Sequence, residues 1–196
     1  MALSVLGLAG SPRRHGNTES LLDQVLAGAA SQGAETDKIV IRRLEIAPCI
    51  ACDKCFETGR CVVQDDYQLV YPKLIVAERI VLASPIFFLG VSAQAKALID
   101  RCQCLWARKY VLKEPLPPTG TGLQRQGFLV STAGGAKTSF DCARKTMRAF
   151  LDTLDAQYAG ELLFADVDEK GAILSHPTAL EEAFALGKSI SFQGER

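Results

Sequence analysis

The chain has 196 residues, 48% of them hydrophobic, and its 22 basic residues balance its 22 acidic residues to a formal net charge of zero. This composition predicts a folded chain with a sizeable core and argues against a basic nucleic-acid surface and against attraction to an anionic membrane. No apolar run approaches the roughly 20 residues of a membrane span, and the apolar N-terminal run lacks the basic segment of a signal peptide. We expect one cytoplasmic domain over residues 1–196, without nucleic-acid or membrane partners.

Short apolar runs rich in β-branched residues alternate with longer segments of helical period. In chain order the sequence predicts a strand over 3–9, a helix over 17–30, a strand over 38–44, a helix over 65–77, a strand over 79–83, a helix over 92–107, a strand over 127–132, a helix over 140–154, a strand over 159–167 and a helix over 177–192. Asp65 or Asp66 and Ser92 are the expected N-caps of the helices that they begin.

Five strands that alternate with five helices predict an α/β fold of three layers, with a parallel sheet covered by helices on both faces. Right-handed crossovers leave few topologies for such a sheet. The stretch 113–126, rich in Pro and Gly, is expected to be an irregular excursion within the domain. Ligands in these folds bind beyond the carboxyl ends of the strands, so the loops after the first, third and fourth strands are the candidate site.

The loop after the first predicted strand has the sequence GSPRRHGNT and leads into a helix. A helix N-terminus presents free N–H groups and partial positive charge, which suit a phosphate group. Ser11, Asn17 and Thr18 offer side-chain donors, and Arg13 adds charge. The loop lacks both the P-loop and the dinucleotide fingerprints, so it predicts a mononucleotide site. The alternative is an ordinary capped helix start with solvated arginines, and His15 is expected to be an exposed loop residue.

The loops after the third and fourth predicted strands complement the first. The third strand is followed by SPIFFLG, whose aromatic side chains could pack on a flat ring, and the fourth by STAGG, whose small residues allow a ligand to approach the backbone. Each loop taken alone has an ordinary alternative, core packing for the aromatic residues and a plain turn for the glycines. Their joint position at one sheet edge is what favours a binding site.

These motifs, G-S-P-R-x-x-G-N-T, S-P-I-F-F-x-G-x-x-S-A-Q-x-K-x-L-I-D-R and S-T-A-G-G in this order, closely resemble the NADPH-dependent FMN reductase group of flavodoxin-like proteins. The resemblance covers residues 3–135 and implies a five-stranded parallel sheet of order 2-1-3-4-5 that binds FMN. It also implies homodimers or homotetramers, with the helix over 92–107 near the interface, and NAD(P)H as a candidate electron donor. The residues that it assigns to FMN are Ser11, Arg13, Asn17 and Thr18 for the phosphate, and Pro85, Ile86, Phe87, Phe88, Thr132, Ala133, Gly134 and Gly135 for the ring and ribityl chain.

Four cysteines, Cys49, Cys52, Cys55 and Cys61, follow the spacing C-x2-C-x2-C-x5-C. Closely spaced thiolates suit an iron–sulfur cube, and the nearby Lys54 and Arg60 would offset their charge. Zinc and unligated reduced thiols are the alternatives left open by the spacing. Within the resembled group, iron–sulfur flavoproteins hold a [4Fe–4S] cluster near the flavin on a motif of this form, which implies that these four cysteines are its ligands.

The remaining cysteines are expected to be structural. Cys102 and Cys104 lie two apart in a predicted helix and should face different sides, and Cys142 opens another helix. A free cysteine commonly packs as a small buried hydrophobic residue. Trp106 suits either the core or a subunit interface.

The sequence thus predicts an FMN protein that transfers electrons between the flavin and a [4Fe–4S] cluster, with no catalytic acid or base residue and with a ferredoxin-type protein as a candidate partner. One alternative is a cluster-free NAD(P)H-dependent FMN or quinone reductase. A second is a redox or metal sensor without enzymatic activity, and a third is a nucleotide-binding regulator that binds no FMN.

Overall fold

The computed structural model describes residues 2–191 and contains one five-stranded sheet, in which every neighbouring pair of strands is parallel. The strands are β1 (Ser4–Ala9), β2 (Glu35–Val40), β3 (Arg79–Pro85), β4 (Arg125–Thr132) and β5 (Ala156–Phe164). Their order is β2-β1-β3-β4-β5, which confirms the flavodoxin-like α/β fold.

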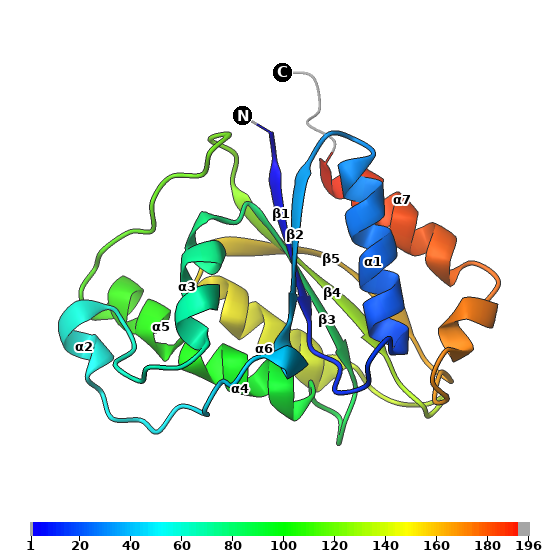
Figure 1. Ribbon diagram of the computed structural model, residues 1–196, viewed down its shortest axis with the longest axis horizontal. Coiled ribbons are helices and arrows are strands. Elements are labelled where there is room, and N and C mark those ends of the chain that lie inside the picture. The colour runs from blue at the N-terminus through cyan, green and yellow to red at the C-terminus, as the bar shows by residue number, and fades with distance from the viewer. Residues whose placement is uncertain (1, 192–196) are drawn as a thin grey trace.

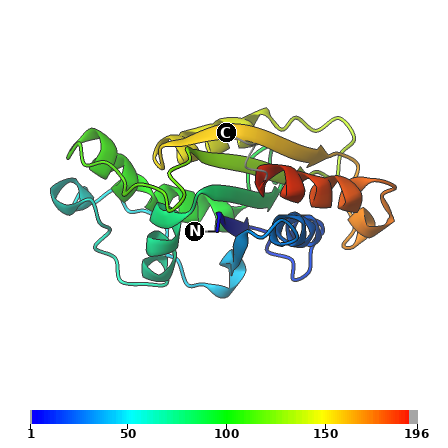
Figure 2. The same ribbon diagram turned by 90° about the horizontal axis from the view of Figure 1, so that it is seen from above.

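Helices cover both faces of the sheet and form the outer layers (Figures 1 and 2). On one face lie α1 (Asn17–Ala30) and α7 (Ala179–Ser191), and on the other α3 (Tyr67–Val76), α4 (Ala93–Arg101), α5 (Gln103–Tyr110) and α6 (Asp141–Asp152). Three short helices lie in the connections, η1 (Ile41–Arg43), α2 (Cys55–Thr58) and η2 (Ala172–Ser175). The buried apolar residues form two clusters, one on each face of the sheet. Across residues 2–191, no helix combines the length and the apolar character that a bilayer crossing requires.

The structure corrects several predicted boundaries. The second strand runs over Glu35–Val40 and not over 38–44, because its first three residues are polar and exposed at the sheet edge, so no apolar pattern marks them. The fifth strand spans Ala156–Phe164 and not 159–167. The predicted helix over 92–107 is two helices, because the backbone of Cys102, with φ −72° and ψ 3°, interrupts it. The last helix begins at Ala179, and the predicted end at Phe192 lies outside the described residues.

The strand register brings the candidate loops to one edge of the sheet. Ala9 at the end of β1 pairs with Val40 of β2 and Ala83 of β3, and Thr132 at the end of β4 pairs with Phe164 of β5. The expected cap Ser92 accepts a hydrogen bond from the N–H of Ala95 and donates one to the carbonyl of Gly10 in the first loop. The Ser92 side chain therefore joins the first loop to the start of α4.

The helices α1 and α7 cross with their backbones in contact, which is possible because both carry glycine at the crossing. A Cβ atom at Gly28 would lie 2.1 Å from the carbonyl oxygen of Phe184, and one at Gly187 would lie 2.0 Å from that of Val25. Any larger residue at either position requires the helices to separate.

Candidate functional site

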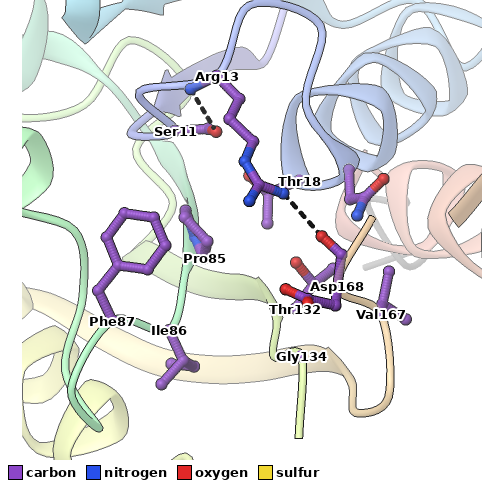
Figure 3. A pocket seen from close by; sticks show the side chains of 11 residues that line it. Ser11, Arg13, Thr18, Pro85, Ile86, Phe87, Thr132, Gly134, Val167 and Asp168 are labelled. Carbon is purple, nitrogen blue, oxygen red and sulfur yellow. Dashed lines mark hydrogen bonds between the residues drawn. The ribbon is translucent and has the colours of Figure 1, made fainter. Parts of the chain in front are cut away.

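An open pocket lies at the carboxyl edge of the sheet, where β1, β3, β4 and β5 end (Figure 3). Its wall contains nine of the twelve residues that the sequence predicts for the flavin, together with two that it does not. The lining residues are Ser11, Arg13, Asn17, Thr18, Pro85, Ile86, Phe87, Thr132, Gly134, Val167 and Asp168.

Three predicted residues lie outside this wall. Phe88 is fully exposed, with a left-handed backbone at φ 47°. Ala133 is buried, and its main chain joins two loops, because its N–H donates to the carbonyl of Phe164 and its own carbonyl accepts from the N–H of Val167. Gly135 forms a turn, in which its carbonyl accepts from the N–H of Thr138.

The end of the pocket at α1 has the chemistry of an anion site. Gly16, the N-cap, makes no side-chain hydrogen bond, so the first N–H groups of α1 keep their donor capacity. The hydroxyl of Thr18 is buried and has no hydrogen-bond partner within residues 2–191. A buried hydroxyl left unpaired costs about 1–3 kcal/mol. A phosphate group at this helix end would supply the acceptor that the hydroxyl lacks.

Two predicted phosphate residues also hold the loop that follows β5. The guanidinium of Arg13 donates to the carbonyl of Asp168 at 2.7 Å, as Figure 3 shows. The side-chain amide of Asn17 donates to the carbonyl of Glu169 at 2.8 Å, and its oxygen accepts from the N–H of Gly171 at 2.8 Å. The Asn17 side chain therefore attaches this loop to α1, and the main-chain N–H of Asn17 remains available to a ligand.

The sequence analysis missed Val167 and Asp168, which complete the pocket from the loop after β5. The available signal was topological, because this loop leaves the same sheet edge as the other three. Asp166, just before these residues, has a left-handed backbone at φ 61°, a conformation that is uncommon outside glycine and turns the chain sharply.

A buried carboxylate lies behind the anion site. Glu19 in the first turn of α1 accepts from the N–H of His15 at 2.9 Å and pairs with Arg42 at 3.0 Å. Burial raises the pKa of Glu19, but the His15 hydrogen bond and the charges of Arg42 and Lys38 outweigh it and hold the pKa below its usual range. The carboxylate is thus ionised and neutralised by two cations, so it does not repel an anion bound at the helix end. His15 itself is exposed, as expected.

The four clustered cysteines line a second pocket, which also contains Cys104 and Arg101. Ala51 and Asp53, on either side of Cys52, have left-handed backbones at φ 50° and φ 57°, which curl the loop tightly around this pocket. Within residues 2–191, no three Cys, His, Asp or Glu side chains converge as ligands of a single metal ion. The donor set, four thiols on one pocket wall, fits a group that binds thiolates.

Among the four clustered cysteines, Cys55 favours its neutral thiol when nothing is bound. Burial, followed by the neighbouring thiols of Cys104, Cys61 and Cys49, raises the pKa of Cys55 to about 11. A cationic guest or a fixed positive charge is needed to hold several thiolates together here. Lys54 is exposed, and the guanidinium of Arg60 lies 5.8 Å from the centre of the Tyr71 ring, where it makes a cation–π contact.

A buried arginine, Arg101, lies at this pocket and pairs with Asp65 through both carboxylate oxygens. Burial raises the pKa of Asp65, but hydrogen bonds from Arg101 and from the N–H groups of Ala47 and Tyr67 outweigh it and lower the pKa. Asp65 therefore carries its negative charge at neutral pH. Of the two expected caps, it is Asp65 whose side chain accepts from the first N–H of α3.

The remaining cysteines differ from expectation in two respects. Cys102 and Cys104 are buried as expected, but they do not face different sides, since both thiols lie within hydrogen-bonding distance of the Tyr67 hydroxyl. The break at Cys102 between α4 and α5 brings them together. Cys142 is exposed, so the prediction that it packs as a buried residue is wrong. Trp106 is partly exposed and packs against Phe56 and Tyr110.

Comparisons with known proteins agree with this geometry. The sequence model of the NADPH-dependent FMN reductase family matches residues 3–169. An iron–sulfur flavoprotein of Methanocaldococcus jannaschii is 43% identical over 103 residues, which make up 53% of this chain and 53% of that protein. The matched stretch thus spans about half the length of that relative.

A second iron–sulfur flavoprotein of the same organism is 30% identical over 149 residues, which make up 76% of this chain and 70% of that protein. Among solved structures, the NAD(P)H:quinone oxidoreductase from Methanothermobacter marburgensis has a TM-score of 0.70 at 12% identity and covers 100% of both chains, a likeness that shows the fold. With the family match over most of its length, this chain belongs to the NADPH-dependent FMN reductase family, within the group of iron–sulfur flavoproteins.

Proposed function

We propose that this protein is an electron-transfer flavoprotein, an oxidoreductase that binds FMN in the pocket at the sheet edge and a [4Fe–4S] cluster in the cysteine pocket. The observation that supports the proposal is that one chain builds two pockets of different chemistry. One has an uncapped helix end and an unpaired buried hydroxyl, which suit a phosphate, and the other has four thiols on one wall.

In this proposal the phosphate of FMN binds the first N–H groups of α1 and the hydroxyl of Thr18, with Ser11 and Arg13 beside it. Arg13 and Asn17 hold the loop after β5, so that Asp168 closes the pocket from the far side. Pro85, Ile86 and Phe87, with Phe88 beside them, and the main chain from Thr132 through Ala133 to Gly135 would hold the flat ring. Cys49, Cys52, Cys55 and Cys61 are the cluster ligands.

When bound, FMN exchanges one or two electrons and the cluster exchanges one at a time, so a protein that holds both can connect two-electron donors to one-electron carriers. The protein supplies placement and charge, and we assign no side chain as an acid or base. We further propose NAD(P)H or a ferredoxin-type protein as electron donor or acceptor, a homodimer or homotetramer as the assembly, and a cytoplasmic location.

Purification without oxygen, followed by a visible spectrum and by assays for FMN, iron and acid-labile sulfide, tests the proposal. The expected result is about one FMN and about four irons and four sulfides per chain. FMN without iron, even after reconstitution with iron and sulfide, would favour the cluster-free reductase. A colourless protein that binds neither group would favour a nucleotide-binding regulator and contradict the proposal.

A further inference from the structure

We propose that Arg101 is a positioning residue for the cluster: its buried guanidinium closes the loop that carries the four cysteines and places a fixed positive charge beside their thiolates. This inference rests on the proposed function, because it assigns a role toward the cluster. It concerns a residue that belongs to neither the predicted flavin residues nor the predicted cluster ligands.

The first support is the way in which Arg101 joins the two ends of the cysteine loop. Its Nη1 donates to the carbonyl of Ala47 at 2.9 Å, just before Cys49, and its Nη2 donates to the carbonyl of Val63 at 3.1 Å, just after Cys61. The same two nitrogens pair with Asp65 at 2.5 Å and 3.2 Å. A single side chain on α4 therefore fixes where the cysteine segment leaves the fold and where it returns.

The second support is the burial of the charge. The side chain of Arg101 is 0% exposed and the guanidinium stacks on the Tyr67 ring at 4.9 Å. Arginine remains protonated in proteins, and a buried arginine without compensation is costly. Among the described residues, Asp65 is its one acidic partner within ion-pair distance, and the Nε–H is buried without any hydrogen-bond partner.

These two observations point toward the pocket that the cysteines share, because Arg101 is itself part of its wall. Thiolates are the anions that this pocket would contain, and an unpaired buried N–H is a donor available to a thiolate sulfur. The other charged groups on this stretch are Asp53, Lys54, Glu57 and Arg60, which are exposed and therefore screened by solvent. A buried positive charge favours the more negative state of a neighbouring redox group, so Arg101 should raise the reduction potential of the cluster.

If Arg101 only held the loop together, its replacement would lower stability without changing the potential of the cluster. Arg125 provides a matched control for that case. Arg125 is also buried, donates to the carbonyls of Ile75 and Pro117 in holding another loop, and has an unpartnered buried Nε–H within residues 2–191. It lies at the start of β4, at the amino edge of the sheet, and is not part of the wall of the cysteine pocket. Loss of this arginine should lower stability without changing the cluster.

The experiment compares Arg101→Gln, Arg101→Lys and Arg125→Gln with the wild-type holoprotein, reconstituted without oxygen. The measurements are the midpoint potential of the cluster, its electron paramagnetic resonance spectrum when reduced, the rate of iron release to a chelator, and the FMN content, which reports folding of the rest of the chain. At the wild-type midpoint, Arg101→Gln should shift the oxidised-to-reduced ratio about tenfold toward the oxidised form, which is about 59 mV for one electron. Arg101→Lys should keep the potential but release iron about tenfold faster, because lysine cannot bridge both ends of the loop.

An Arg101→Gln protein that keeps FMN and iron at the wild-type midpoint potential would overturn the proposal, as would an equal shift in Arg125→Gln. If Arg101→Gln fails to bind FMN and is thus misfolded, Arg101→Lys decides, and an unchanged rate of iron release in that variant would also overturn it. A wild-type protein without iron after reconstitution contradicts the proposed function instead, which separates the two failures.

Discussion

The pocket at the sheet edge, which is the proposed flavin pocket, and the cysteine pocket are built in different ways. Residues of the flavin pocket come from four loops between Ser11 and Asp168, and the register of the parallel strands brings them together. The cysteine pocket comes from one short segment and the junction of α4 and α5. That segment is held by Arg101, which donates to the carbonyl of Ala47, and by Asp65, which accepts from the N–H of Ala47. The first pocket follows from the topology, whereas the second is a local addition fastened to it, so the two should respond separately to mutation.

The largest expected effect is the loss of the cluster from Cys55→Ser. Cys55 is the most buried of the four cysteines, and a serine hydroxyl is a poor replacement for a thiolate ligand. Iron should fall from about four to below about one per chain, while FMN content stays near wild type. The measurement is iron and FMN analysis after anaerobic reconstitution.

Cys104→Ser is the matched control, since Cys104 lines the same pocket but lies outside the motif. It should keep iron near the wild-type level. Loss of FMN along with iron in Cys55→Ser would show that the two pockets are not separable. If Cys104→Ser lost its iron while Cys55→Ser kept it, Cys104 and not Cys55 would be the cluster ligand.

The next effect is expected at Asn17, which tests how the flavin pocket is held. Asn17→Ala removes hydrogen bonds to Glu169 and Gly171 and a longer one to Ile173, which should lower the free energy of unfolding by about 2–4 kcal/mol. FMN affinity should fall as well, because the loop that carries Asp168 loses its attachment to α1. Urea unfolding of the apoprotein and FMN titration measure the two quantities.

Asn17→Asp sharpens this test, because it keeps the acceptor for Gly171 but adds a negative charge next to the proposed phosphate. Its apoprotein should be more stable than that of Asn17→Ala, yet it should still bind FMN weakly. Normal FMN affinity in Asn17→Asp would argue against a phosphate at this helix end.

A smaller effect is expected from Thr18→Val, which should weaken FMN binding without lowering the stability of the apoprotein. The substitution replaces an unpaired buried hydroxyl with a methyl group of similar size, so the apoprotein should be as stable as wild type or more stable. The affinity for FMN should nevertheless fall by about 1–3 kcal/mol, because the hydrogen bond to the phosphate is lost. Thr146→Val in α6, at a half-buried position outside the pocket wall, serves as the control. A Thr18→Val apoprotein that is destabilised, with unchanged FMN affinity, would contradict the assigned role.

The smallest expected effect is a change in pH dependence at Glu19. Its pKa in the folded chain lies below the unfolded value of about 4.3, so its ion pairs stabilise the fold above that pH, and this contribution is lost as the pH falls through the folded pKa. The stability difference between wild type and Glu19→Gln should therefore be full near pH 7 and shrink in acid. Urea midpoints between pH 3 and pH 7 measure it, with the exposed Asp23→Asn as control. A difference that stays constant with pH would show that Glu19 is not titrating in this range.

The sequence predicted the fold well, and it named most of the residues that line the pocket at the sheet edge, because both depend on patterns that it displays directly. Buried strands such as β3 and β4 are continuous apolar runs, and the loops that follow them carry distinctive small or aromatic residues. The edge strand β2 was misplaced because its polar start carries no such pattern.

No sequence motif marked Asp168, and only the topology indicated it, because the loop after β5 leaves the same sheet edge as the other three loops and is held there by Arg13 and Asn17. Arg101 was visible in the motif L-I-D-R but gave no sign of its partners, because Ala47, Val63 and Asp65 are far away in the sequence. The spacing of the cysteines predicted one shared pocket, whereas the participation of Cys104 required the helix break at Cys102.

The contact between α1 and α7 through Gly28 and Gly187 has a consequence for the lifetime of the protein. A ligand bound to both Arg13 and the loop at Asp168 stabilises only the closed arrangement, in which α7 lies on α1. Local opening of the C-terminal helix should then become rarer, and such openings are where proteases gain access to a chain. We expect the apoprotein to be degraded faster than the FMN-bound form, so that the supply of flavin controls the amount of this protein.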